Sequence, residues 1–193
     1  MTESAATREA VVVREARWPD DEAILESIRR HVFIEEQGVP REIEWDGREA
    51  EALHAVAETD GEAIGCGRLL PDGRIGRLAV LAPHRRSGVG ARILDKLLHL
   101  ARRRGDRHVY LHAQEAARDF YCRAGFTARG EPFDEAGIRH IDMALDLDYR
   151  DWQEAIVGLR YPSPFDQLVI AQARSARREI CVLSPKLDAR LFD

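Results

Sequence analysis

The chain has 193 residues, 45% of them hydrophobic, which is enough to bury the core of one full α/β domain and leave a small extension. A net charge of -5 and a pI near 5.8 argue against a nucleic-acid-binding surface, and no apolar run approaches the roughly 20 residues needed to cross a bilayer. The polar opening has no signal-peptide pattern, and the three cysteines lack metal-ligand or disulfide spacing. These features predict a cytoplasmic protein with no metal centre and no nucleic-acid or membrane partner.

The first 50 residues predict a strand, a helix and an acidic connector. Three valines at 11–13 favour a strand, and a helix is expected after Pro19 because three acids occupy its first turn. Its buried face is marked at helical spacing by Ile24, Leu25, Ile28 and Val32. Residues 32–47 then mix aromatic side chains with carboxylates, a composition that often borders sites. A solvated connector is at least as good an interpretation of any one of its acids, Glu35, Glu36, Glu42 and Glu44.

An antiparallel meander of three strands is expected next, over residues 53–58, 63–70 and 75–81. Turns separate the strands, because Asp60-Gly61 and Asp72-Gly73 are strong turn formers. The third strand leads directly into a loop that contains two glycines.

This loop reads Arg85-Arg86-Ser87-Gly88-Val89-Gly90-Ala91 and precedes a strongly periodic helix over 89–104. Glycines let the backbone approach a ligand closely, and the first N–H groups of the helix have no acceptor within the helix. The positive end of the helix dipole and the two arginines add attraction for an anion. The loop therefore predicts a diphosphate site, and a tight turn without a ligand is the alternative.

The remaining elements follow at short intervals. A buried strand is expected at 108–113, a short helix at 115–123 and a last strand at 138–147. The short links favour parallel pairing between the 75–81 strand and the 108–113 strand. Residues 149–193 have a different pattern and predict a separate extension, either an appendage or the start of a second domain.

Two motifs together resemble the GNAT superfamily of N-acyltransferases. The loop fits the pattern Gln/Arg-x-x-Gly-x-Gly/Ala of the acyl-CoA pyrophosphate loop, and residues 120–126 spell Phe-Tyr-x-x-x-Gly-Phe about 30 residues downstream. Residues 32–37 and Gly137-Ile138-Arg139-His140 are similar to the ElaA-like branch. The resemblance covers residues 10 to 148.

The resemblance implies an α/β (α+β) fold with a mixed central sheet flanked by helices, a GNAT domain over 1–148 and an extension over 149–193. It also implies direct transfer of an acetyl group from acetyl-CoA to a primary amine, without a covalent enzyme intermediate or a metal. The acceptor is a small-molecule or peptide amine, a polyamine and a lysine being among the candidates. The oligomeric state stays open, with a homodimer as one option.

The resemblance further assigns residues to the cofactor. The main chain of Leu78, Ala79 and Val80 holds the thioester arm like an added strand, and a backbone N–H near Val80 polarises its carbonyl. Gln114 hydrogen-bonds the pantetheine arm or, alternatively, simply ends its strand. The diphosphate is held by Arg85, Arg86, Ser87, Gly88, Val89, Gly90 and Ala91.

Tyr121 is the predicted acid for the departing thiolate, because a phenol is protonated at neutral pH; a structurally hydrogen-bonded tyrosine is the alternative. The base is less clear, since residues 76–79 carry no carboxylate where many GNAT enzymes have a glutamate. His140 is the preferred base because a neutral imidazole suits proton removal near pH 7. The other candidates are His112, Glu135, the Glu35/Glu36 pair and a chain of water molecules.

The missing strand carboxylate also favours a second hypothesis from a different class. The domain could bind acyl-CoA without catalysis and regulate a partner domain at its C-terminus. Transfer or hydrolysis of acetyl-CoA with a broad amine panel separates this module from an enzyme.

Overall fold

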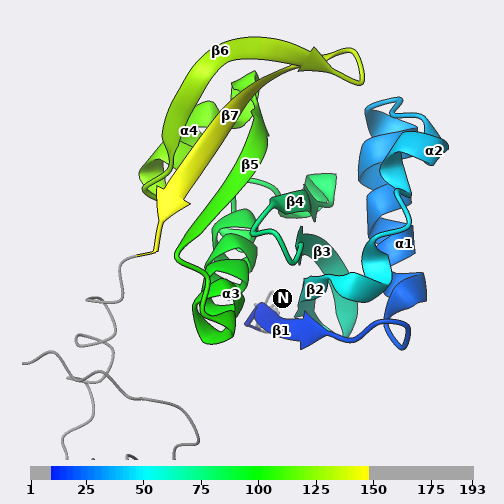
Figure 1. Ribbon diagram of the computed structural model, residues 1–193. Coiled ribbons are helices and arrows are strands. Elements are labelled where there is room, and N and C mark those ends of the chain that lie inside the picture. The colour runs from blue at the N-terminus through cyan, green and yellow to red at the C-terminus, as the bar shows by residue number, and fades with distance from the viewer. Residues whose placement is uncertain (1–9, 148–193) are drawn as a thin grey trace, which may run out of the picture. The chain divides into compact units, whose positions relative to one another are not determined.

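Two antiparallel sheets diverge around a central helix in residues 10–147, the part of the chain that the computed structural model describes (Figure 1). The strands are β1 (Val12–Ala16), β2 (Leu53–Thr59), β3 (Glu62–Leu69), β4 (Ile75–Val80), β5 (His108–Gln114), β6 (Thr127–Glu135) and β7 (Ile138–Asp146). One sheet has the order β1-β2-β3-β4 and the other the order β5-β7-β6. The helical segments are α1 (Glu22–Arg29), the π-helix η1 (Arg30–Glu36), α2 (Arg41–Glu44), α3 (Val89–Arg104), α4 (Arg118–Arg123) and the short 3-10 turns η2 (Glu49–Glu51), η3 (Ala82–His84) and η4 (Glu115–Ala117).

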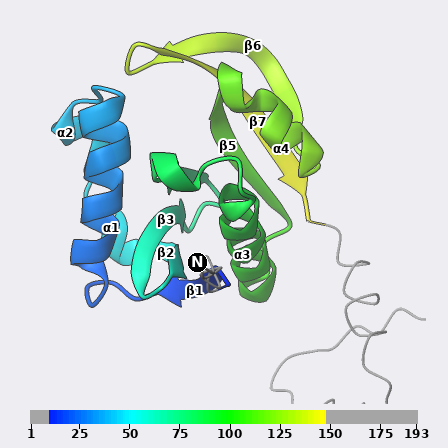
Figure 2. The ribbon, with the colours of Figure 1, turned by 180° about the vertical axis from the view of Figure 1, so that it is seen from behind.

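The first sheet is buried on both faces. On one side Leu25 and Ile28 of α1 pack against Val56 and Ala79, and on the other side the apolar stripe of α3 packs against the alternate residues of the strands. Figure 2 shows α1 and α3 on opposite sides of β2 and β3. This double coverage explains why β2 and β3 are almost continuously apolar or small.

Helix α3 lies unusually close to β3 because two glycines of the strand face it. A Cβ atom built on Gly65 would lie 2.8 Å from Ile93 Cδ1, and one on Gly67 would lie 2.8 Å from Leu97 Cδ1. A Cβ on Gly65 would also lie 2.8 Å from the carbonyl oxygen of Ala79, so a larger residue there would collide with the backbone of β4 as well as with the side chains of α3. This close packing fixes where the amino end of α3 lies beside the end of β4.

The structure confirms the meander, the long helix and the strands predicted near residues 11, 108 and 138. It adds β6, which sequence reasoning missed. This edge strand pairs with β7, contains Gly130 and Pro132, bulges between Arg129 and Phe133, and exposes most of its side chains. It therefore lacks the apolar alternation that reveals a half-buried strand.

Two further expectations need correction. The predicted parallel pairing of the 75–81 strand with the 108–113 strand is reduced to a single bridge between Arg74, just before β4, and Tyr110, and the ladder of β5 is formed with β7 on its other edge. The helix expected after Pro19 is α-helical only to Arg29 and continues as η1. The domain boundary at 148 and the elements expected in residues 149–193 lie outside the described residues.

Candidate active site

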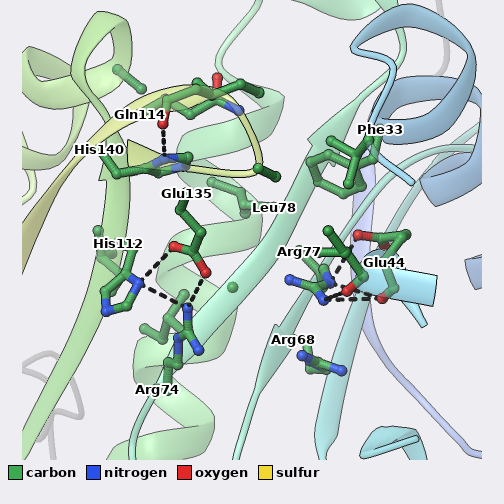
Figure 3. A pocket seen from close by; sticks show the side chains of 18 of the residues that line it. Phe33, Glu44, Arg68, Arg74, Arg77, Leu78, His112, Gln114, Glu135 and His140 are labelled. Atoms are coloured by element: carbon green, nitrogen blue, oxygen red, sulfur yellow. Dashed lines mark hydrogen bonds and ion pairs between the residues drawn. The ribbon is translucent and has the colours of Figure 1, made fainter. Parts of the chain in front are cut away.

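A hollow opens where β4 and β5 separate. The two strands meet at the Arg74–Tyr110 bridge and diverge beyond it, and the space between them measures about 1040 Å³ including its open mouth. Its walls come from β4, β5, the β6–β7 turn and the segment from η1 to α2 (Figure 3). Leu78, Gln114, Tyr121 and His140 all line it, so four of the predicted site residues are brought together.

Strand β4 carries a bulge at the edge of this hollow. Residues Arg77 and Leu78 together oppose Gly67, and Arg77 has a φ of 52°, in the left-handed region that non-glycine residues rarely adopt. A bulge interrupts the ladder, so main-chain groups near Leu78 are turned away from β3. Ala79 is buried in the core, with 1% of the residue exposed, and does not line the hollow.

The amino end of α3 has the features of an anion site. Gly88 is in the left-handed conformation with a φ of 86°, and no side chain caps the helix. The first intrahelical bond shown there runs from the N–H of Arg92 to the carbonyl of Gly88, so the N–H groups of Val89, Gly90 and Ala91 precede the helical ladder. A Cβ on Gly90 would make only ordinary contacts, at 3.7 Å or more, so packing alone does not require glycine there.

The loop side chains differ in how they are engaged. Ser87 donates its hydroxyl to the carbonyl of His84 at 2.6 Å, which holds the loop in its turn. Arg86 is exposed and also has a positive φ of 59°. Arg85 donates to the carbonyl of Val80 at 2.8 Å and forms an ion pair with Glu36 at 2.5 Å. Arg85 is therefore held by the protein itself.

The neighbouring residue Gln37 makes a similar contact across the hollow. Gln114 Nε2 donates to Gln37 Oε1 at 3.0 Å, although the two residues lie 77 positions apart in the chain. Together with Glu36–Arg85, this bond ties the end of η1 to two residues that the resemblance assigns to the cofactor.

Tyr121 lies in the short helix α4 and lines the hollow. Phe120 and Phe126 pack edge-on against its ring, with centroids 4.9 and 5.9 Å away. Burial raises the pKa of Tyr121 to about 12, and no polar group of the described residues hydrogen-bonds its hydroxyl. The phenol is thus a protonated donor without a structural partner in this part of the chain.

His140 and His112 occupy different surroundings. His140 is buried, and its Nδ1 lies 2.8 Å from the carbonyl of Ile138. A carbonyl only accepts, so we assign the hydrogen to Nδ1, which leaves the lone pair on Nε2. His112 Nδ1 instead lies 2.7 Å from Glu135 Oε2 and 2.9 Å from Arg74 Nη2.

Glu135 is therefore part of a three-residue group with His112 and Arg74 (Figure 3). Partial burial opposes ionisation, but the hydrogen bond and charge of His112 and the charge of Arg74 lower the pKa of Glu135 below its ordinary value. Glu135 is thus a carboxylate at neutral pH. The other acidic candidates lie elsewhere: Glu35 pairs with His31 and Arg30, Glu36 pairs with Arg85, and neither lines the hollow.

The opposite wall is built on a buried ionic cluster that sequence reasoning missed. Glu44 is not part of a solvated connector, since only 2% of it is exposed. Its carboxylate lies 2.5 Å from Arg29 Nε and 2.9 Å from Arg77 Nε. Burial raises the pKa of Glu44, although Arg29 and Arg77 pull in the other direction. The full cluster consists of Arg29, Arg68, Arg77, Glu44, Asp46 and Glu49.

No sequence signal identified this cluster, because its partners are separated by up to 33 positions and follow no motif spacing. A hint lies in the amphipathic pattern of α1, where Arg29 follows Ile28 on the buried side. Arg29 also stacks over Trp45, with its guanidinium carbon 4.0 Å from the ring centroid. A buried arginine is rarely found without paired acceptors, and Arg29 has two carboxylates and a carbonyl.

The splayed strands, the bulge and the uncapped helix define an acyl-CoA N-acyltransferase fold. Residues 15–147 match the family model described as an acetyltransferase (GNAT) domain, and the chain belongs to this family. No metal-binding group of three or more His, Cys, Asp or Glu side chains occurs within residues 10–147. No helix in that range is long and apolar enough to span a bilayer.

Its relatives include bacterial proteins described as acetyltransferases. An uncharacterised N-acetyltransferase of Bacillus subtilis, YjcF, is 37% identical over 123 residues, covering 62% of this chain and 88% of that protein. ElaA of Escherichia coli is 30% identical over 128 residues, covering 62% and 84%. Among solved structures, an acyl-CoA N-acyltransferase from Pseudomonas aeruginosa is 30% identical with a TM-score of 0.63, covering 70% of this chain and 99% of that one. These matches confirm the predicted family and its ElaA-like branch.

Proposed function

We propose that the protein transfers an acetyl group from acetyl-CoA directly to a primary amine. The observation that carries this proposal is the uncapped amino end of α3, which follows closely on the bulged edge strand of an open hollow. Acetyl-CoA supplies an anionic diphosphate and an activated acetyl thioester. The residues present fit that chemistry, because Gly88 and Gly90 leave main-chain N–H groups unobstructed and packing does not explain Gly90.

The loop Arg85-Arg86-Ser87-Gly88-Val89-Gly90-Ala91 would bind the diphosphate through its N–H groups and the two arginines. The main chain of Leu78, Ala79 and Val80 would hold the thioester arm, and an N–H of this strand would donate to the thioester oxygen. Gln114 would donate to the arm once its bond to Gln37 opens.

Proton transfer would involve the two sides of the hollow. His140 takes a proton from the amine at Nε2, a new N–C bond forms, and the C–S bond breaks. Tyr121 then donates its hydroxyl proton to the departing thiolate, and its unpaired, protonated state suits this role. Solvent returns the proton from His140 to Tyr121, so the protein ends as it began. The His112–Glu135 pair is the second candidate for the base.

Calorimetric titration of acetyl-CoA, followed by loss of thioester absorbance with a panel of amines, tests the proposal. We expect a dissociation constant of roughly micromolar order and turnover with at least one amine. Binding without any turnover would favour an acyl-CoA-binding regulatory module, and absence of binding would exclude both functions.

A further inference from the structure

The charges that line the hollow are not those of a site for a polycation. They comprise three arginines and two glutamates, Arg68, Arg74, Arg77, Glu44 and Glu135. Although the chain as a whole is acidic, this site therefore has no excess of negative charge. A polyamine, with several positive charges on one chain, would meet more cations than anions here.

Arg77 presents an unused donor to the hollow. Its Nε and Nη2 atoms donate to the carbonyls of Glu44 and Ile43, at 3.2 and 2.9 Å, and Nε also pairs with the Glu44 carboxylate. Its Nη1 has no partner among the described residues, and 21% of the side chain is exposed. Residues Ile43 and Glu44 thus hold the guanidinium through Nε and Nη2, while Nη1 stays available to a ligand.

The backbone at Arg77 supports a functional interpretation of this placement. A positive φ costs a non-glycine residue on the order of 1–3 kcal/mol and is tolerated where the surroundings enforce it. The ionic cluster around Glu44 provides that enforcement. Arg77 is therefore a preorganised cation that needs no rearrangement to receive a carboxylate.

Glu135 provides the complementary charge on the other side. Figure 3 shows the Arg74–Glu135–His112 group and the Arg77–Glu44 pair facing each other across the hollow. The Glu135 side chain is 39% exposed, whereas that of Glu44 is 3% exposed. The hollow consequently presents a carboxylate on one side and a guanidinium on the other, and Phe33, Val39 and Leu78 contribute apolar lining.

From this arrangement we infer that the acceptor is a free amino acid, an amine that carries its own carboxylate. Its ammonium group would bind near Glu135 and release one proton to solvent, which leaves the neutral amine that attacks the thioester and passes a second proton to His140. Its carboxylate would accept from Arg77 Nη1, and an apolar side chain would contact Phe33 and Val39. The inference rests on the proposed acetyl transfer, and it narrows the amine to a zwitterion.

A matched ligand pair tests this inference without requiring turnover. L-leucine, L-leucinamide and spermidine are titrated by calorimetry into the full-length protein, with CoA bound and without it. L-leucinamide keeps the shape and the amine but has no carboxylate, and it also represents a peptide amino terminus. We expect L-leucine to bind at least tenfold more tightly than either of the others, which corresponds to about 1.4 kcal/mol.

The variant Arg77→Gln should reduce this preference to below about threefold, whereas Arg77→Lys should retain part of it because the charge remains. Arg48→Gln is the matched control, since Arg48 pairs with Glu51 at the surface and does not line the hollow. Circular dichroism spectra verify folding. If Arg77→Gln does not fold, the comparison of the three ligands on the unmodified protein and on Arg77→Lys still decides the matter.

Equal binding of L-leucine and L-leucinamide, tighter binding of spermidine, or no binding of L-leucine in either form of the protein would overturn the inference. Acetylation of spermidine or of L-leucinamide in preference to L-leucine would overturn it as well, while leaving the proposed acetyl transfer intact. Failure of acetyl-CoA to bind would instead contradict the proposed function, and titrations without CoA would still report on the amino-acid site.

Discussion

The proposed diphosphate site and the wall of the hollow beside α2 present charge in different ways. At the amino end of α3 the groups available to an anion are main-chain N–H groups, because no side chain caps the helix at Gly88. At the α2 end they are side-chain charges, held by a buried cluster whose members come from α1, α2, η2, β3, β4 and the link after α2. A main-chain site is thus specified by a few neighbouring residues, whereas a side-chain site depends on tertiary packing.

The largest effect is expected from disrupting the buried ionic cluster around Glu44. Arg29→Met leaves Glu44 and Glu49 buried without their cation, because Arg29 contacts both carboxylates. Loss of one partner from a buried ion pair costs about 3–5 kcal/mol, so the free energy of unfolding measured in urea should fall by that amount. Arg41→Met, at an exposed pair with Glu26, should change it by less than about 1 kcal/mol. Equal losses in the two variants would show that the cluster does not stabilise this wall.

The next largest effect is expected at Gly88, at the amino end of α3. Gly88→Asp adds a negative charge and a strained side chain where the diphosphate is proposed to bind, so acetyl-CoA affinity should fall about 100-fold. Gly105→Asp is the control, since Gly105 lies at the opposite end of α3 with a positive φ and open surroundings. Both variants should lose some stability, and calorimetry should find weaker binding only for Gly88→Asp. Unchanged binding in Gly88→Asp would place the diphosphate elsewhere.

Tyr121 lines the hollow and is expected to affect turnover rather than binding. Tyr121→Phe should keep acetyl-CoA affinity and slow turnover at least tenfold, because the thiolate loses its proton donor. Since the pKa of Tyr121 is raised to about 12, loss of its proton should not reduce activity between pH 7 and 10. Steady-state rates and calorimetry measure the two effects separately. Normal turnover in the variant would remove Tyr121 from the mechanism.

The smallest effect is expected at the ion pair between Glu36 and Arg85. Glu36→Gln removes the ion pair that holds Arg85, so Arg85 becomes available to the diphosphate and acetyl-CoA affinity should rise about two- to fivefold. Glu35→Gln is the matched control, because Glu35 pairs with His31 and Arg30 instead. Calorimetry compares the two variants with the unmodified protein. A weaker affinity in Glu36→Gln would indicate that the pair holds Arg85 in its binding position.

Several features of the site were within reach of sequence reasoning, and others were not. The loop at Gly88 and the Phe120–Phe126 motif were recognisable because spacing along a helix or turn fixes spacing in space. The wide separation of β4 from β5 was not, since strand links suggest pairing but do not set its length. The exposed strand β6 could not be predicted, because it has few apolar residues and so no hydrophobic pattern.

Local patterns were enough to predict the family, the meander, the helix with its glycine loop, and the grouping of Tyr121, Gln114 and His140 in one region. The burial of Glu44 beside Arg29 and Arg77, and the contact of Glu135 with His112 and Arg74, became visible in the folded chain alone. The two kinds of feature differ in the sequence distance over which they are set. Backbone conformation and helix termini are set by residues within a few positions, but the partner of a buried charge is set by how distant segments pack, and no local pattern encodes it.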